Sequence, residues 1–318
     1  MRSGGHAPFQ SSASIVEGVT IDLQSLNQVT VSADTKTVNI GPGNRWGDVY
    51  ARLAPQGLAT SGGRVASVGV GGLVLGGGVS YFSAQKGFVC DTVKRFEIVL
   101  PSGRIGNATQ SSHHDLWLAL KGGSNNFGIV TAIEQEAFEL SDFWGGSIGG
   151  DESTFPAQFA AFEAFTGNSD YDPNAALINS HTYVVSTNSW LAVNAIEYTK
   201  PEPTIITTKA AGKGGNSLGL DGSEGNVFNF LLSASWSLAS DSDLMDKAVK
   251  KIINAAKIKA EGLGLYKKYI YLNYAAEWQD PIDGYGASVK ARLQSVGRKY
   301  DPLGIFHKQV PGGFKLFN

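Results

Sequence analysis

The sequence predicts an α+β protein in two successive parts, each built on a sheet with few helices. Short β-branched runs separated by polar turns dominate the chain before residue 140. Apolar residues recur at helical spacing in only a few segments. Between the two parts, Ser141–Ser153 contains glycine and serine without any hydrophobic period, and we place the domain boundary there.

The first part is expected to consist mostly of strands. The runs that predict them are Val19–Leu23, Val29–Ala33, Thr37–Ile40, Arg95–Leu100 and Asn126–Phe138. One helix is expected after Asn44, a suitable N-cap residue, with apolar positions at helical spacing from Trp46 to Leu53 before Pro55 ends it. A second, short helix is expected at Asp115–Lys121.

The second part is expected to be a sheet covered by helices. Four phenylalanines fall on one helical face, which favours packing of that helix against the sheet: Phe155, Phe159, Phe162 and Phe165. Strands are expected at Ala175–Ser186, Trp190–Tyr198 and Val227–Trp236. A helix from Asp241 is expected to turn Leu244, Ala248, Val249, Ile252 and Ile253 inward. His181 faces either a substrate pocket or packed side chains of the sheet.

Composition argues against several classes of function. The formal net charge is −2 and the basic residues are scattered, so no nucleic-acid partner is expected. No run of about 18 apolar residues could span a bilayer, and the N-terminus has no apolar signal-peptide core, so we expect no membrane partner and leave the compartment open. The single cysteine, Cys90, allows no internal disulfide and no thiolate-rich site, and no metal is expected.

Glycine clusters carry the chemical information. The stretch from Gly69 to Gly78 resembles a phosphate-binding loop, yet Val74 stands where a dinucleotide fingerprint needs glycine, and the Lys-Ser/Thr pair of a Walker loop is absent. Two interpretations remain. The exposed amides could form a nest for a pyrophosphate, or the glycines could permit tight packing alone.

Several motifs occur in the order found in one known family. They are Arg2-Ser3-Gly4-Gly5-His6, Val19–Leu23, Gly41-Pro42-Gly43, Gly69–Gly72, Gly76–Gly78, Gly122–Thr131, Tyr271–Tyr274 and Tyr300–Pro302. Together they resemble the berberine bridge enzyme-like flavoproteins of the vanillyl-alcohol oxidase superfamily. The resemblance implies a p-cresol methylhydroxylase (PCMH)-type FAD-binding domain at 1–142, a substrate domain with an antiparallel sheet at 143–265, and a segment at 266–318 that returns to the FAD domain.

The resemblance also implies that the chain is shortened. Relatives carry a further strand and helix before the first motif, and the substrate domain lacks a portion near 200–203. Such a loss would leave apolar faces and a sheet edge exposed.

Covalently bound FAD is the cofactor that the resemblance implies. In the family the histidine after the paired glycines bonds to the 8α-methyl group of the flavin, which gives that role to His6. Gly4 and Gly5 would let the cofactor approach the backbone. The residues expected to bind FAD are Arg2, Ser3, Gly4, Gly5, His6, Val68, Gly69, Gly71, Gly72, Gly76, Gly77, Asn126, Gly128, Ile129, Val130 and Tyr274. Val65 stands where many relatives have a second, cysteinyl attachment, so a single bond is expected.

The reaction implied is oxidation of a hydroxyl-bearing small molecule, such as an alcohol, a sugar or a specialised metabolite. Tyr271 matches the tyrosine that takes the hydroxyl proton as hydride leaves, and Asn273 would set its position; a tyrosine packed against the sheet is the other interpretation. Val68 is the residue type that permits access of O2, so an oxidase is expected. A dehydrogenase with another acceptor and a non-catalytic remnant stay open. Pro8 and Leu73 replace active-site residues of plant relatives, which disfavours berberine-type ring closure, and the family suggests secretion.

Overall fold

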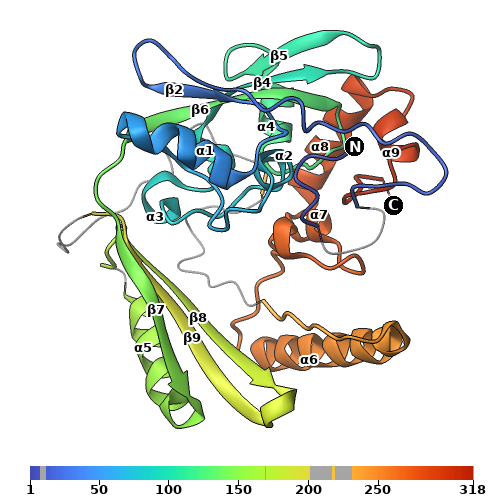
Figure 1. The fold of residues 1–318 in the computed structure, drawn as a ribbon. Coiled ribbons are helices and arrows are strands. Elements are labelled where there is room, and N and C mark those ends of the chain that lie inside the picture. The colour runs from blue at the N-terminus through green and yellow to red at the C-terminus, as the bar shows by residue number, and fades with distance from the viewer. Residues whose placement is uncertain (8–11, 169, 201–216, 219–230, 318) are drawn as a thin grey trace.

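The larger of two sheets forms the centre of the first part. The computed structural model describes residues 1–7, 12–168, 170–200, 217–218 and 231–317 (Figure 1). This sheet has the strand order β1-β2-β6-β4-β5, with β3 also pairing to β6, and every described pairing is antiparallel. Its strands are β1 (Val29–Val31), β2 (Thr37–Ile40), β3 (Leu58–Thr60), β4 (Val93–Val99), β5 (Ile105–Thr109) and β6 (Ile129–Glu139).

Helices lie below this sheet in the view of Figure 1 and close its core. They are α1 (Trp46–Leu53), α2 (Val70–Leu75), α3 (Ser83–Lys86) and α4 (His114–Leu120). The core contains the fully buried Trp46, Phe96, Phe127 and Ile133. Burial of aromatic and branched side chains from both layers is the main force that holds them together.

Two details of the first part differ from expectation. Asn44 does not cap α1: its Nδ2 donates to Gly41 O at 3.0 Å, and Arg45 is the flanking residue, whose N–H donates to the Asp48 carboxylate at 3.3 Å. The strand expected at Val19–Leu23 is reduced to a single bridge between Arg2 and Asp22. Pairing between these two segments ends there, because Gly5 adopts the left-handed conformation (φ +64°) and turns the N-terminal segment away from Val19–Leu23.

The second sheet has three antiparallel strands in the order β7-β9-β8, and it extends downward from the first in Figure 1. They are β7 (Trp144–Asp151), β8 (Ala175–Val184) and β9 (Ser189–Tyr198). β7 lies in the passage where the domain boundary is placed. No strand is predicted there, because four glycines interrupt the alternation that identifies a strand. Within the described residues β7 and β8 each leave one edge unpaired.

Helix α5 (Phe155–Gly167) packs on this sheet as expected. The rings of Phe155 and Phe159 lie 4.3 and 4.7 Å from that of His181, so this histidine faces the helix. Helix α6 (Ser242–Gly262) differs from expectation, because none of its residues is buried and Leu244 is 67% exposed. Residues 231–236 form no strand, and the rest of the strand expected at Val227–Trp236 lies outside the described residues.

The C-terminal elements pack on the first part. They are α7 (Pro281–Gly284), α8 (Ala287–Tyr300) and α9 (Ile305–Lys308). Tyr285, directly after α7, donates its hydroxyl to Gly122 O at 3.1 Å. The domain limits at 142/143 and 265/266 stay predictions, whereas the α+β class with antiparallel sheets is confirmed.

Candidate functional site

Three loops of the first part converge around the paired glycines near the N-terminus. Ser3 Oγ donates to Pro42 O and accepts from the Gly71 N–H at 3.2 Å. The Val70 N–H donates to Asn44 O at 3.0 Å, and Arg45 and Gly69 form an isolated bridge. The motifs expected to bind the cofactor at residues 2–6 and 69–72 are therefore adjacent.

Two glycines of this cluster, Gly4 and Gly69, meet backbone to backbone. A Cβ at Gly4 would lie 2.4 Å from Gly69 Cα, and a Cβ at Gly69 would lie 2.5 Å from Gly4 N. Neither position has room for a side chain. The N–H groups of Gly4 and Gly5 donate to no described acceptor of the chain, so they can receive an anionic group such as a pyrophosphate. Tight packing is thus observed at Gly69, and a nest for a pyrophosphate stays a prediction.

His6 is exposed at the edge of the same cluster. Its Nε2 lies 3.2 Å from Ser67 Oγ, within hydrogen-bond distance. Ser67 immediately precedes Val68, the residue expected to control access of O2. An exposed imidazole with one nitrogen held by a hydroxyl group can carry a covalent attachment on its other nitrogen.

The second half of the glycine-rich stretch packs against the Tyr271 motif. A Cβ at Gly76 would lie 1.8 Å from Asn273 Oδ1, so glycine is required at that position. Asn273 Nδ2 donates to Leu73 O and to the Tyr271 hydroxyl, both at 3.0 Å. Gly77 has φ +105° and lies against Leu218. The expected catalytic residues thus adjoin the helix that begins beside Gly4.

Tyr271 is 4% exposed. Burial raises the pKa of its phenol well above the ordinary value, while the amide of Asn273, the Val79 N–H and the Arg64 charge each lower it by less. The ring of Tyr274 lies 4.8 Å from that of Tyr271 in an edge-to-face arrangement. Tyr271 is therefore a neutral phenol at ordinary pH, and both Asn273 and Tyr274 fix its ring.

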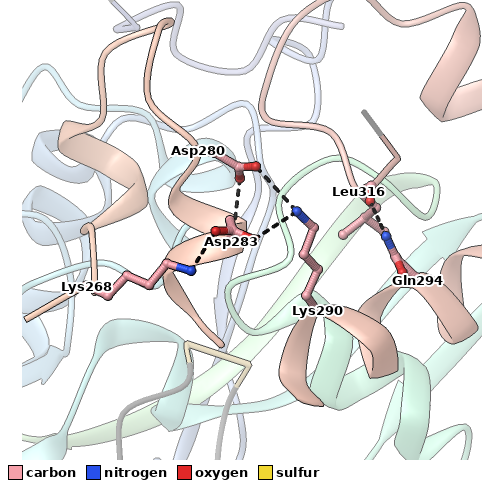
Figure 2. Close-up of polar contacts among 6 residues, drawn as sticks. All are labelled: Lys268, Asp280, Asp283, Lys290, Gln294 and Leu316. Atoms are coloured by element: carbon pink, nitrogen blue, oxygen red, sulfur yellow. Dashed lines mark hydrogen bonds and ion pairs between the residues drawn. The ribbon is translucent and has the colours of Figure 1, made fainter. Parts of the chain in front are cut away.

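An ion-pair network holds the segment that leads to Tyr271 (Figure 2). Lys268 Nζ lies 2.7 Å from the Asp283 carboxylate, and Lys290 Nζ of α8 lies 3.3 Å from Asp283 and 3.4 Å from Asp280. Gly284 lets α7 approach this segment, because a Cβ there would lie 2.8 Å from Lys268 O. The network is exposed, so its role is to set the position of the segment more than to stabilise the fold.

The remaining expected cofactor residues form a separate group near the C-terminus. Asn126 Nδ2 donates to Phe314 O at 2.9 Å, and its buried Oδ1 has no partner among the described residues. A Cβ at Gly128 would lie 2.6 Å from Val99 O, and Ile129 and Val130 begin β6. No described contact joins this group to His6. The unpaired oxygen of Asn126 is an acceptor that a ligand could satisfy.

Arg2 also departs from its expected role. Its guanidinium lies 2.5 Å from the Asp22 carboxylate on the surface. An arginine paired in this way serves first to hold the N-terminal segment against the loop of Asp22.

Three polar residues near Tyr271 were missed by sequence reasoning. Arg64 donates to the Tyr274 hydroxyl at 2.5 Å. Tyr81 interacts electrostatically with Glu197 of β9, and burial raises the pKa of each. The only signal for Arg64 is its place directly after Gly62 and Gly63, and no sequence pattern marks Tyr81 or Glu197.

Two other kinds of feature are absent from the described part of the chain. None of the helices there has both the length and the apolarity to cross a membrane. No group of three or more His, Cys, Asp or Glu side chains with the geometry of a metal site occurs among residues 1–7, 12–168, 170–200, 217–218 and 231–317.

Comparison with known proteins identifies the family. A family model described as an FAD binding domain matches residues 1–109. The FAD-dependent monooxygenase drtC of Aspergillus calidoustus is 32% identical over 99% of this chain and 77% of its own length. The chain belongs to the berberine bridge enzyme-like, PCMH-type family of FAD-dependent oxidoreductases. The expected fold and the cofactor FAD are thereby confirmed.

Further relatives of this flavoprotein agree. The FAD-dependent monooxygenase sdcF of Emericella nidulans is 33% identical over 99% of this chain and 84% of its own length. The solved structure of the BBE-like 1 protein of Physcomitrella patens superposes with a TM-score of 0.75 at 17% identity, covering 98% of this chain and 85% of that one. For 6-hydroxy-D-nicotine oxidase from Arthrobacter nicotinovorans the TM-score is 0.73 at 18% identity, covering 96% and 84%. These structures show a shared fold.

The alignment with drtC shows that this chain and its relative differ in length within the aligned region. It spans 402 positions against the 318 residues of this chain, so at least 84 positions of the relative have no counterpart here. Because the alignment covers 99% of this flavoprotein, those positions lie within it. Within the aligned region this chain is therefore shorter than drtC. The expected loss near residues 200–203 and before the first motif stays a prediction.

The close approach of Gly4 and Gly69 leads to a test by two matched glycine substitutions. Gly69→Ala places a methyl group against the Gly4 backbone, and we expect the free energy of unfolding of the flavin-free protein to fall by about 1–3 kcal/mol. Gly72→Ala adds a methyl group with no protein atom within 4 Å, inside α2, so stability should be unchanged or higher by about 0.5–1 kcal/mol. Urea denaturation measures both changes. Equal stability of the two variants would contradict the close contact.

Proposed function

We propose that the protein is an oxidase that removes hydride from a hydroxyl-bearing small molecule, passes it to FAD and returns the electrons to O2. The observation that carries the proposal is the placement of Tyr271. Its buried phenol adjoins Asn273 and Gly76, and Gly76 ends the glycine-rich helix that begins beside Gly4. The residue proposed as base and the residues proposed to bind the cofactor are therefore connected through α2, which supports the proposal.

The residues present fit FAD. The free amides of Gly4 and Gly5 would bind its pyrophosphate, His6 would carry the covalent bond, and the open face of Gly72 leaves room for the ring system. Asn126 would offer its unpaired oxygen to the cofactor. When bound, the flavin supplies a two-electron acceptor for the substrate hydride.

The protein's own contribution is to place and move one proton. In its ionised form Tyr271 would accept this proton from the substrate hydroxyl and become a neutral phenol, and the Asn273 amide, which donates to the phenol oxygen, would stabilise the phenolate before the transfer. Arg64 adds positive charge through Tyr274. Because burial raises the pKa of Tyr271, only a small fraction of the phenol is ionised at neutral pH, so proton removal should become easier as pH rises.

Two features bear on the electron acceptor. Val68, directly before Gly69, is the residue type that is expected to admit O2. The relatives drtC and sdcF are named FAD-dependent monooxygenases, which supports a second candidate function in which one oxygen atom of O2 enters the product. A dehydrogenase that uses another acceptor is the third possibility.

Products formed under 18O2 distinguish these functions. An oxidase should release H2O2 in a one-to-one ratio with oxidised product and leave the product unlabelled. Retention of one labelled oxygen in the product would support the monooxygenase instead. Flavin reduction by substrate without reoxidation in air would indicate a dehydrogenase, and a protein that incorporates no flavin would be a remnant.

Covalent attachment is tested by mass. We expect intact protein, denatured after expression with added riboflavin, to carry one adduct of FAD mass, because His6 is exposed and held by Ser67. His6→Ala should lose the adduct completely. His307→Ala is the matched control, since that imidazole packs against Phe317 and should leave the adduct unchanged. An adduct that survives in His6→Ala would exclude this attachment point.

The pH dependence of flavin reduction tests the role of Tyr271. If the ionised phenol is the base, the logarithm of the reduction rate constant should rise with pH between 6 and 9, with a slope approaching one, because the raised pKa lies above this range. Tyr271→Phe should lower the rate by about 10²–10⁴-fold and remove the slope. Anaerobic stopped-flow spectroscopy measures both effects. A plateau below pH 8 in the wild type would point to a carboxylate such as Glu197.

A further inference from the structure

Arg64 is a half-buried guanidinium held at a defined place beside Tyr271. Gly62 and Gly63, directly before it, press against the Trp46 ring, where a Cβ on either would lie 2.2 and 2.6 Å from ring carbons. The Tyr50 hydroxyl donates to Gly63 O at 2.8 Å. The backbone that carries Arg64 therefore has little freedom to move.

Most N–H donors of the Arg64 guanidinium have no acceptor among the described residues. It gives one hydrogen bond, to the Tyr274 hydroxyl at 2.5 Å, and no described carboxylate forms an ion pair with it. By contrast, Arg2 and Arg95 are both paired with carboxylates. A guanidinium presents five N–H donors in a planar fork that suits a carboxylate or another anionic oxygen. A guanidinium fork with most of its donors unused by the described residues is a binding group for an anion.

Aromatic side chains lie around Arg64, and they indicate what kind of ligand would fit beside its guanidinium. Tyr274 and Tyr271 lie edge to face, and Phe88 lies 6.3 Å from Tyr271 between ring centroids. The centroids of the Tyr81 and Phe143 rings lie 5.7 Å apart. The charges of Arg64 and Glu197 both influence the pKa of the Tyr81 hydroxyl. Such a set of aromatic rings favours a flat, aromatic ligand.

Glu197 is the acidic group that faces this region from the second sheet. Burial raises the pKa of its carboxyl group, and its interaction with Tyr81 lowers that pKa by less. One carboxylate oxygen lies against Gly145 of β7, where a Cβ would be 1.9 Å away. An anionic ligand would meet Arg64 as its favourable partner.

We propose that Arg64 is a specificity-determining residue that binds an ionised oxygen, carboxylate or phenolate, of an aromatic substrate while its hydroxyl group lies at Tyr271. The inference rests on the proposed function for the position of the substrate. It adds the substrate class: aromatic molecules that carry both an oxidisable hydroxyl and an acidic group.

Matched acid and amide probes test the charge requirement with the FAD-loaded full chain. The first pair is 4-(hydroxymethyl)benzoate and 4-(hydroxymethyl)benzamide, and a second pair with a naphthalene ring covers a larger ligand. For phenolate, 4-hydroxybenzyl alcohol at pH 10 is compared with its methyl ether. Dissociation constants are measured by isothermal titration calorimetry, which needs no turnover. The charged member of at least one pair should bind about 10-fold tighter or more, and high salt should reduce that preference.

Substitutions at Arg64 test whether this residue causes the preference for the charged ligand. In Arg64→Gln the ratio of the two dissociation constants should fall to about one, and Arg64→Lys should retain part of it because the charge remains without the fork. Arg52→Gln is the control, since that exposed side chain only donates to Asn27 O. Thermal unfolding verifies that each variant folds, and the flavin absorbance of each reports its FAD content.

The outcomes separate this inference from the proposed function. Wild-type protein that shows no preference, or binds no probe in any pair, overturns the inference, as does an unchanged preference in Arg64→Gln. Loss of FAD from Arg64→Gln with no change in the preference would assign Arg64 to the cofactor and also overturn it. Preference without H2O2 formation leaves the inference standing and rejects the oxidase alone.

Discussion

The contact of two bare stretches of backbone, at Gly4 and Gly69, sets the geometry of the whole site. No side-chain carbon fits at either residue, so the N-terminal loop lies directly on the start of α2. His6 and Ser67 meet because of that contact, and α2 carries it onward to Gly76, where the same lack of a side chain admits Asn273. The proposed attachment point and the proposed base, far apart in sequence, are linked by two close approaches that only glycine permits.

The chemistry follows from what surrounds Tyr271. A phenol removed from water resists ionisation, and the structure offsets this resistance in part through the Asn273 amide and the Arg64 charge. Arg64 acts through Tyr274 and keeps most of its own donors free. One guanidinium could therefore serve both to ease proton removal and to select the molecule from which the proton comes. The ion pairs of Lys268 and Lys290 with Asp283 connect the segment before Tyr271 to α7 and α8 (Figure 2).

Sequence reasoning succeeded where the local pattern and the packing agree. The alternating run of β6 and the helical spacing of α1 are strong local signals, and both elements formed close to the predicted limits. β7 was missed because its glycines hide alternation, and the strand at Val19–Leu23 was overestimated because its partner turns away at Gly5. The inward face expected for α6 failed for a long-range reason: amphipathic spacing shows which face is apolar but not whether a neighbour covers it.

The candidate site, like the fold, could be predicted from the sequence only in part. Ordered motifs predicted which segments meet, and the contacts of Gly4, Gly69, Gly76 and Asn273 agree with that prediction. The burial of Tyr271 and the hydrogen bond from Arg64 to Tyr274 depend on residues 210 positions apart in the chain, which no local pattern encodes.

The three-stranded sheet has a practical consequence for handling the protein. Among the described residues nothing pairs with the outer edges of β7 and β8, and of the side chains on these two strands only Asp151 is charged. Edges that lack lysine, proline or a covering element recruit strands from neighbouring molecules. Self-association in concentrated solution would begin at this end of the molecule, far from the glycine contact, and a lysine introduced on either outer strand is the simplest remedy for crystallisation work.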